Sequence, residues 1–111
     1  MKIQVTEKKP GIILLVLEGD LDMSTSPQVR NALMPLFRKA PSHVIVDLSG
    51  VPYIDSSGIA TFVEGLQFSR KGNIRFTLAG ATPTVESIFD LAYLKSVFEM
   101  APDANRLVDG E

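Results

Sequence analysis

The chain has 111 residues, a formal charge of −2 from 11 basic and 13 acidic side chains, and no cysteine. This length predicts a single domain, residues 1–111, that can bury a core without needing disulfides or metal ions for stability. The lack of cysteine excludes disulfides, cysteine zinc sites and thiol nucleophiles, and it fits a reducing compartment. The slightly negative net charge does not indicate the broad positively charged surface that binding to a phosphate backbone requires, so we do not expect nucleic acid as a partner.

The N-terminal residues do not resemble a signal peptide, because no long apolar stretch follows a basic start. The longest apolar run, residues 12–17, is far shorter than the ~20 residues that a membrane helix needs. We therefore expect a soluble, cytoplasmic protein with no direct membrane insertion.

Two strands are expected first. Ile3 and Val5 alternate with polar residues, which is typical of a half-exposed edge strand, and Pro10-Gly11 then marks a turn. Residues 12–17 are continuously apolar, as in a more central strand. These two strands should form an antiparallel hairpin.

An acidic loop, Glu18-Gly19-Asp20-Leu21-Asp22, ends the second strand. Carboxylates can act as acid/base catalysts or metal ligands, but three on one loop are more often solvated. A hard cation also needs further oxygen ligands, and no second acidic cluster supplies them. We therefore predict no metal site and no catalytic site here.

A helix should follow, with Ser26 as its N-cap and Pro27 in its first position, where a missing N–H costs nothing. Pro35 lies inside this helix and would kink or end it. The helix is nevertheless predicted to continue, because apolar residues on one face flank Pro35: Val29, Ala32, Leu33, Leu36 and Phe37.

The most informative stretch runs from a buried strand at residues 44–48 through a polar corner into a helix. Asp55, Ser56 and Ser57 lie where an apolar helical stripe begins, so one of them is expected to cap the helix. A hydroxyl at a helix N-terminus is well placed to carry an anion such as phosphate. The plainer alternative is that Asp55-Ser56-Ser57-Gly58 is only a capped turn.

His43 invites a catalytic interpretation, which the expected geometry excludes. It opens the central strand, whereas Ser56 lies beyond the other end. A strand of five or six residues is ~17–20 Å long. A Ser-His-Asp triad needs hydrogen-bond reach, and Ser56 also lacks a Gly-x-Ser-x-Gly frame. We therefore expect no such catalytic triad, and hence no enzyme of this class.

The helix after the corner should span about residues 57–70 and end with Gly72 as the residue after its C-cap. Gly65 lies inside it and costs ~1 kcal/mol relative to alanine, which suggests close packing against a neighbour.

Three further elements complete the chain. Residues 74–78 alternate as a strand, and Thr82 is the expected N-cap of a helix that begins at Pro83. Residues 97–100 read as a short last strand, and the core should end near residue 100. The tail, residues 101–111, has a poor apolar stripe and is expected to be a frayed helix.

This order of elements predicts an α/β fold: a mixed, mostly parallel sheet of four or five strands with an antiparallel N-terminal edge hairpin and three or four helices. The polar corners after the parallel strands, which hold Asp22, Ser56 and Gly80 to Thr82, should converge on one edge of the sheet.

The segment Asp47-Leu48-Ser49-Gly50-Val51-Pro52-Tyr53-Ile54-Asp55-Ser56-Ser57-Gly58-Ile59-Ala60 closely resembles the signature of STAS domains, the fold of bacterial anti-sigma factor antagonists. The acidic loop before Met23, the strand Phe76 to Gly80 and the next helix match the family in order. The resemblance covers roughly residues 3–100.

The resemblance implies that the protein binds an anti-sigma factor, usually a serine kinase with a histidine-kinase-like ATPase fold, and thereby frees a sigma factor. It implies that phosphorylation of the serine after the aspartate, Ser56, ends the binding, with Ser57 as the alternative acceptor. A phosphatase would reverse the modification, and no cofactor is implied. The expected partner-binding residues are Asp22, Met23, Ser24, Asp55, Ser56, Ser57, Gly58, Gly80 and Thr82.

Two alternatives remain open. STAS domains also occur as cytoplasmic subunits of phospholipid-trafficking ABC transporters, where the partner is an ABC transporter ATPase, and as tails of sulfate transporters. Fold alone does not separate these roles. Nucleotide binding or weak hydrolysis has little support, since the chain has neither a Gly-x-x-x-x-Gly-Lys loop nor a Gly-x-Gly-x-x-Gly turn.

Overall fold

The computed structural model of the protein describes residues 1–109, without the side chain of Asp109. Five strands and four helices follow one another along the chain: β1 (Lys2–Lys9), β2 (Ile12–Glu18), α1 (Ser26–Arg38), β3 (His43–Gly50), α2 (Ser56–Lys71), β4 (Arg75–Ala79), α3 (Pro83–Leu91), β5 (Glu99–Ala101) and α4 (Ala104–Asp109). None of these helices is long and apolar enough to cross a membrane. Residues 110 and 111 of the predicted tail lie outside the described part.

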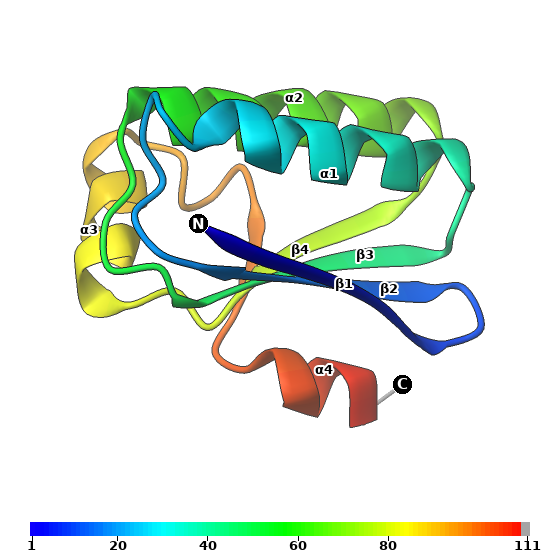
Figure 1. Cartoon of the computed structure of the whole chain (residues 1–111). Coiled ribbons are helices and arrows are strands. Elements are labelled where there is room, and N and C mark those ends of the chain that lie inside the picture. Colours follow the sequence, from blue (N-terminus) through cyan, green and yellow to red (C-terminus); the bar gives the residue numbers. More distant parts are fainter. Residues whose placement is uncertain (110–111) are drawn as a thin grey trace.

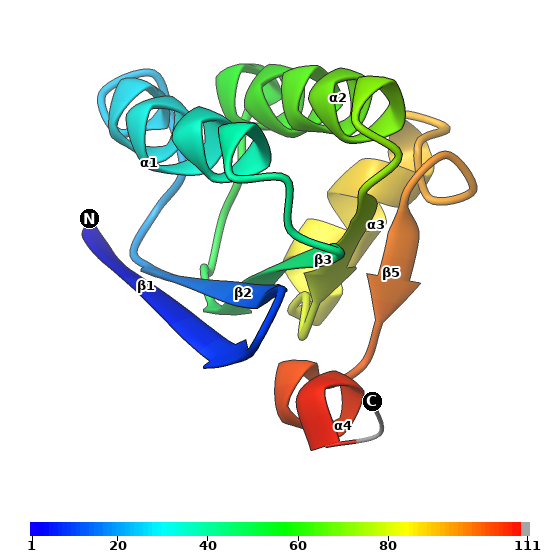
Figure 2. The same ribbon diagram turned by 90° about the vertical axis from the view of Figure 1, so that its right-hand side faces the viewer.

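The strands form one sheet in the order β1-β2-β3-β4-β5. β1 and β2 are antiparallel, and the other neighbours are parallel. Because each right-handed crossover moves one strand further in the same direction, the connecting helices lie on the same side of the sheet. Figure 1 and Figure 2 show α1 and α2 above the sheet and α4 below it. The predicted fold is confirmed.

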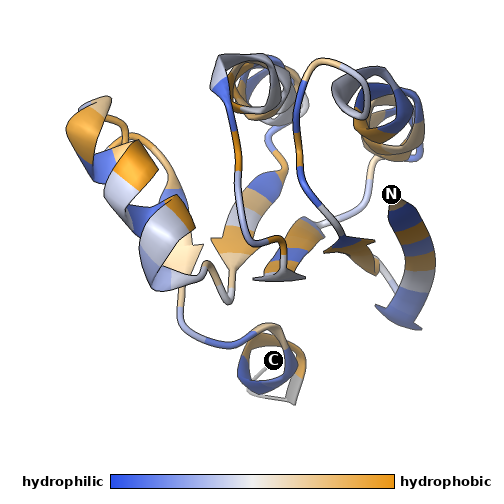
Figure 3. Cartoon of the chain, turned by 60° about the vertical axis from the view of Figure 1, so that its left-hand side comes forward, coloured by the Kyte–Doolittle hydropathy of each residue, from blue (hydrophilic) through white to orange (hydrophobic). Residues whose placement is uncertain are grey.

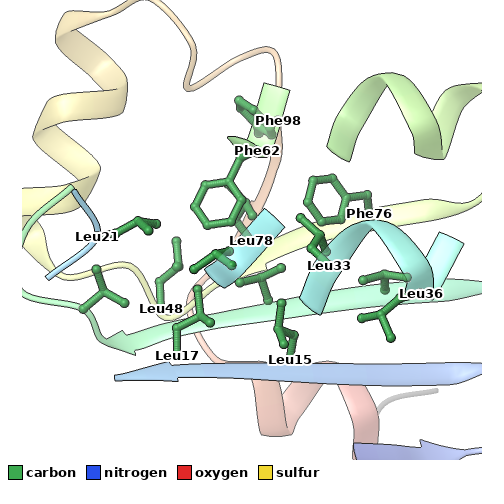
Figure 4. Packing of buried hydrophobic residues seen from close by; sticks show 14 of the residues in the cluster. Leu15, Leu17, Leu21, Leu33, Leu36, Leu48, Phe62, Phe76, Leu78 and Phe98 are labelled. Atoms are coloured by element: carbon green, nitrogen blue, oxygen red, sulfur yellow. The ribbon is translucent and has the colours of Figure 1, made fainter. Parts of the chain in front are cut away.

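The main core lies between the sheet and its connecting helices. Side chains of three strands point into it, among them Leu15, Leu48 and Leu78, and they meet Phe62 from α2 and Leu33 from α1 (Figure 4). All five are inaccessible to solvent. This side of the sheet holds the two helices that begin at the predicted polar corners, so the core fixes where those corners lie.

A second, smaller core lies on the opposite side of the sheet, under α4. Ala104 and Val108 of α4 are buried there against Leu14 and Ile45. Sequence reasoning placed the end of the core near residue 100, whereas the structure extends it to residue 108. Two buried positions four residues apart form too short a stripe to stand out in the sequence, yet they suffice for one helical turn.

Two unusual residues inside the helices have structural explanations. Pro35 lies within α1, which continues to Arg38 as predicted. Asn31, whose carbonyl loses its hydrogen bond, is exposed on the same face as Pro35, so water can replace the partner. Gly65 of α2 packs closely, as expected: a Cβ there would lie 3.1 Å from Cδ2 of Leu33.

The C-terminus of α2 differs from the prediction. Gly72 is the C-cap with φ −88°, and Asn73 adopts the left-handed conformation with φ +54°. The Ile74 N–H donates to the Ser69 carbonyl (2.8 Å) and the Asn73 N–H to the Arg70 carbonyl (3.3 Å). This pair of bonds is a Schellman motif, and asparagine is one of the few non-glycine residues that adopt its left-handed position readily.

The last strand is also displaced from its predicted position. Residues 97 and 98, expected in the strand, instead donate their N–H groups to the Leu94 carbonyl in a turn, and β5 is confined to Glu99–Ala101. Phe98 is buried there against Phe89, with ring centroids 5.5 Å apart. The apolar character of Phe98 therefore reflects core packing and not strand pairing.

Candidate functional site

The corner between β3 and α2 is capped by Asp55. Its Oδ1 accepts hydrogen bonds from the N–H groups of Ser57 (2.8 Å) and Gly58 (3.3 Å), which would otherwise lack partners in the first turn. The Ser57 hydroxyl also donates to Oδ1 at 2.5 Å. This last bond is the main reason that the pKa of Asp55 is lowered, and the nearby Asp22 charge opposes the shift.

The two serines of this corner differ in availability. Ser57 is half-buried, and its hydroxyl is engaged by Asp55. Ser56, the first residue of α2, is exposed. Among residues 1–109 no group forms a hydrogen bond with the Ser56 hydroxyl. The corner therefore displays one free hydroxyl at the start of a helix.

Asp22 organises the neighbouring loop between β2 and α1 in a similar way. Its Oδ1 accepts from the Ser24 hydroxyl (2.6 Å) and from the N–H groups of Ser24 (2.9 Å) and Thr25 (3.2 Å). The Ser24 hydroxyl is the main reason that the pKa of Asp22 is lowered. Both aspartates thus remain charged at neutral pH and are tied to a serine two residues later.

The start of α1 corrects one prediction. The N-cap is Thr25, one residue before the predicted Ser26, and Pro27 consequently occupies the second helical position. The Asp22 carbonyl accepts the N–H groups of Thr25 (3.1 Å) and Ser26 (2.8 Å), so the chain is already turning when it reaches the helix. Ser26 is buried and is absent from the exposed surface of the site.

Backbone hydrogen bonds join the two loops. Leu21 forms an isolated parallel bridge with Ile54: its N–H donates to the Tyr53 carbonyl (2.9 Å), and its carbonyl accepts the Asp55 N–H (3.0 Å). Figure 3 shows the two connections running side by side from the sheet up to α1 and α2. The bridge holds the Asp22 and Asp55 turns next to each other.

Gly58 is the close-packing position beneath this bridge. It is buried, and a Cβ added to it would lie 2.6 Å from Cγ of Leu21 and 2.7 Å from Cγ1 of Ile54. Sequence reasoning placed Gly58 in the partner-binding surface. Its burial assigns it a supporting position under that surface, where only glycine leaves room for both neighbours.

The third predicted corner lies beside the first two. Gly80 has φ +70°, and a Cβ there would lie 3.2 Å from Oδ1 of Asp47 on β3. Thr82 caps α3 as predicted by accepting the Val85 N–H (3.3 Å), and its hydroxyl also reaches the carbonyl of Val51 (3.4 Å). Both residues are half-buried, so they border the exposed part of the site.

His43 lies at the opposite end of β3 from this corner. It is buried, and its Nε2 is 2.7 Å from Oγ1 of Thr77. Within residues 1–109 there is no group of three or more His, Asp or Glu side chains that could hold a metal ion. The site thus consists of a free hydroxyl, two charged carboxylates and hydrogen-bonded turns.

A family model described as the STAS domain matches residues 4–106. The chain belongs to the STAS domain family. Two relatives are named anti-sigma-B factor antagonist. The one from Staphylococcus epidermidis is 28% identical over 82 residues, which cover 74% of this chain and 76% of the relative. The one from Listeria monocytogenes is 26% identical over 100 residues, which cover 90% and 88%.

Solved structures of other STAS proteins have the same fold. The anti-sigma factor antagonist SpoIIAA in its unphosphorylated form superimposes with a TM-score of 0.84 at 20% identity, covering 98% of this chain and 95% of that one. The phosphorylated form of the Bacillus cell fate determinant SpoIIAA gives 0.78 at 18% identity, covering 98% of both chains. At these identities the likeness establishes the fold.

Each of the two bridged loops of this STAS domain carries one large exposed side chain. Met23, on the Asp22 loop, is 79% exposed, and Tyr53, just before Ile54, is 47% exposed. Met23 was among the predicted partner-binding residues, and Tyr53 was not. The available signal was a large aromatic residue close to the Asp55 turn.

Proposed function

We propose that this STAS domain is a binding module without catalytic activity, an anti-sigma factor antagonist whose partner affinity is set by phosphorylation of Ser56. Unmodified, it binds an anti-sigma factor that is a serine kinase with a histidine-kinase-like ATPase fold, and so frees a sigma factor for transcription. Phosphorylation by that kinase ends the interaction, and a phosphatase restores it. The names of the two relatives support the antagonist role.

The observation that carries the proposal is the difference between the two serines. The Ser56 hydroxyl is exposed and free of hydrogen bonds within the described residues, whereas that of Ser57 donates to Asp55. A kinase needs an accessible hydroxyl, which favours Ser56 as the acceptor. SpoIIAA, which shares the fold, has been solved in unphosphorylated and phosphorylated forms.

The proposed switch acts through charge. A phosphoserine adds about −1.5 to −2 charges at neutral pH. At Ser56 this charge would stand beside the carboxylates of Asp22 and Asp55, in the surface that a partner must cover. Asp55 already accepts the N–H groups of Ser57 and Gly58. The phosphate would therefore remain at the surface, where it repels the partner without refolding the chain.

Affinity capture from the native cytoplasm tests the partner. Wild-type and Ser56→Asp baits are compared by mass spectrometry, with Gln67→Glu as a control that adds one negative charge at an exposed position further along α2. The proposal predicts that wild type and Gln67→Glu retain a kinase-like ATPase that Ser56→Asp loses. Equal retention of an ABC transporter ATPase and permease by all three baits would instead establish a transporter subunit and reduce Asp55 and its serines to a helix cap.

Phosphate mapping tests the acceptor. Incubation of the captured kinase and ATP with wild type, Ser56→Ala and Ser57→Ala should place phosphate on Ser56, abolish it in Ser56→Ala and preserve it in Ser57→Ala. Phosphate found on Ser57 by tandem mass spectrometry would contradict the assignment.

A further inference from the structure

The end of the molecule opposite the Ser56 corner carries three pairs of adjacent cations. One pair lies at the β1–β2 turn, one at the C-terminus of α1 and one at the C-terminus of α2, and all six side chains are exposed. We call this surface the basic end: Lys8, Lys9, Arg38, Lys39, Arg70 and Lys71. Taken singly along the sequence, each pair is ordinary solvated charge beside a turn.

The topology brings the three pairs together. The β1–β2 turn and the C-termini of α1 and α2 each precede the amino end of a parallel strand, and these strands are neighbours: Ile12 pairs with His43, which pairs with Arg75. The Ser42 N–H donates to the Gly11 carbonyl (2.9 Å), and the Arg75 N–H to the Ser42 carbonyl (3.1 Å). Figure 2 looks onto this end of the molecule.

The cations of the basic end are not neutralised by side chains that the structure describes. The ion pairs in residues 1–109 are those of Lys2, Arg30, Arg75 and Lys95 with glutamates. The six positive charges are partly offset by Glu7 and by two helix C-termini, each equivalent to about −0.5 charge. About four positive charges remain at the basic end. The opposite edge carries Asp20, Asp22, Asp47 and Asp55, so the domain is electrically polarised.

A hollow adjoins these cations. It has a volume of about 420 Å³ and lies between the β1–β2 turn and the end of α1. Apolar and polar residues line it together: Val5, Glu7, Gly11, Ile13, Lys39, Ala40 and Pro41. Val5 is 47% exposed although it lies on a strand. The basic end therefore combines positive charge with an accessible depression whose walls are partly apolar.

We propose that the basic end binds an anionic phospholipid surface, with the Ser56 corner directed away from it. The three pairs of cations lie on separate turns and helix ends at the same end of the molecule. This arrangement fits a flat, diffuse layer of anionic headgroups. The exposed apolar wall of the hollow, formed by Val5 and Ala40, can contact the apolar part of a lipid beside those headgroups. The acidic edge is repelled by the same surface, so only one orientation is favoured. Binding is peripheral and leaves Ser56 open to its partner.

Vesicle sedimentation at low salt tests this inference. Vesicles of equal parts phosphatidylglycerol and phosphatidylcholine should bind the wild-type protein, and vesicles of phosphatidylcholine alone should not. Each Lys or Arg near an anionic surface changes binding about fivefold, so the triple variant Lys9→Gln, Lys39→Gln, Lys71→Gln should bind about a hundredfold more weakly. The matched control is Lys2→Gln, Lys95→Gln, Arg106→Gln, which has the same net charge. It should bind like wild type, and circular dichroism should show both variants folded.

Two results overturn the proposal. Equal loss by both triple variants would show that net charge matters and position does not. Retention on heparin without any vesicle binding would assign the basic end to a different polyanion. Hydrogen exchange of the vesicle-bound protein adds a positional readout: protection is expected at residues 8–11, 38–42 and 70–73, and none at residues 55–58. None of these outcomes depends on the phosphorylation switch at Ser56.

Discussion

Replacement of Gly58 by alanine should destabilise the protein and loosen the site above it. The new Cβ would lie 2.6 Å from Cγ of Leu21 and 2.7 Å from Cγ1 of Ile54, closer than side-chain atoms approach. Neither neighbour can move into solvent, because their exposed fractions are 0% and 1%. Overpacking of this kind costs about 1–3 kcal/mol.

Helix propensity acts in the opposite direction. Alanine is favoured over glycine by about 1 kcal/mol inside a helix and by less in the first turn, where Gly58 lies. We therefore expect a net loss of about 1–2 kcal/mol, which lowers the Tm of a domain of this size by about 4–8 °C. The displaced side chains form the Leu21–Ile54 bridge, so the Asp22 and Asp55 turns should separate as well.

Thermal unfolding followed by circular dichroism measures the loss, and backbone NMR shifts of Asp22 and Asp55 report the separation. Gly72→Ala is the matched control. It adds the same methyl group at an exposed helix end, where the nearest atom is Cδ1 at the tip of Ile74 (2.9 Å), which can rotate. If Gly58→Ala were as stable as wild type, with unchanged shifts, the claim that only glycine fits under the bridge would be refuted.

Three further predictions concern the fold. Phe62→Ala, in the centre of the main core, should lower the free energy of unfolding by about 3–5 kcal/mol in urea titrations, while Phe68→Ala, 39% exposed, should cost less. Deletion of residues 102–111 uncovers Leu14 and Ile45 and should cost on the order of 3 kcal/mol, with increased binding of a hydrophobic dye. The folded-state pKa values of Asp22 and Asp55 are lowered, so the stability that these groups contribute is complete above about pH 4. This contribution should disappear as the pH falls through the folded-state pKa values. In the double variant Asp22→Asn, Asp55→Asn, the free energy of unfolding should therefore decrease less as the pH is lowered.

Much of the fold follows from local patterns. The Thr82 cap, a cap among Asp55, Ser56 and Ser57, the helix across Pro35 and the edge hairpin are all visible in the sequence. Capping residues and apolar periodicity act over only a few residues. The convergence of the Asp22 and Asp55 turns also follows once the strands are taken as parallel.

The misplaced elements depend on contacts that short patterns do not contain. Ser26 resembles an N-cap, but the chain already turns around the Asp22 carbonyl, which moves the cap to Thr25. The burial of Gly58 comes from a bridge between two loops some thirty residues apart. The basic end is likewise a product of topology, since its three pairs are widely separated in the chain.

The central claim is that a negative charge at Ser56 releases the partner, and equilibrium binding tests it most directly. The kinase-like ATPase identified by capture, once purified, is titrated with wild type, Ser56→Asp and Gln67→Glu by isothermal calorimetry. Like charges brought together at an interface cost several kcal/mol, so Ser56→Asp should bind at least about a hundredfold more weakly while Gln67→Glu binds like wild type. Equal affinity of Ser56→Asp and wild type would contradict the switch and leave Ser56 as one residue of a capped helix.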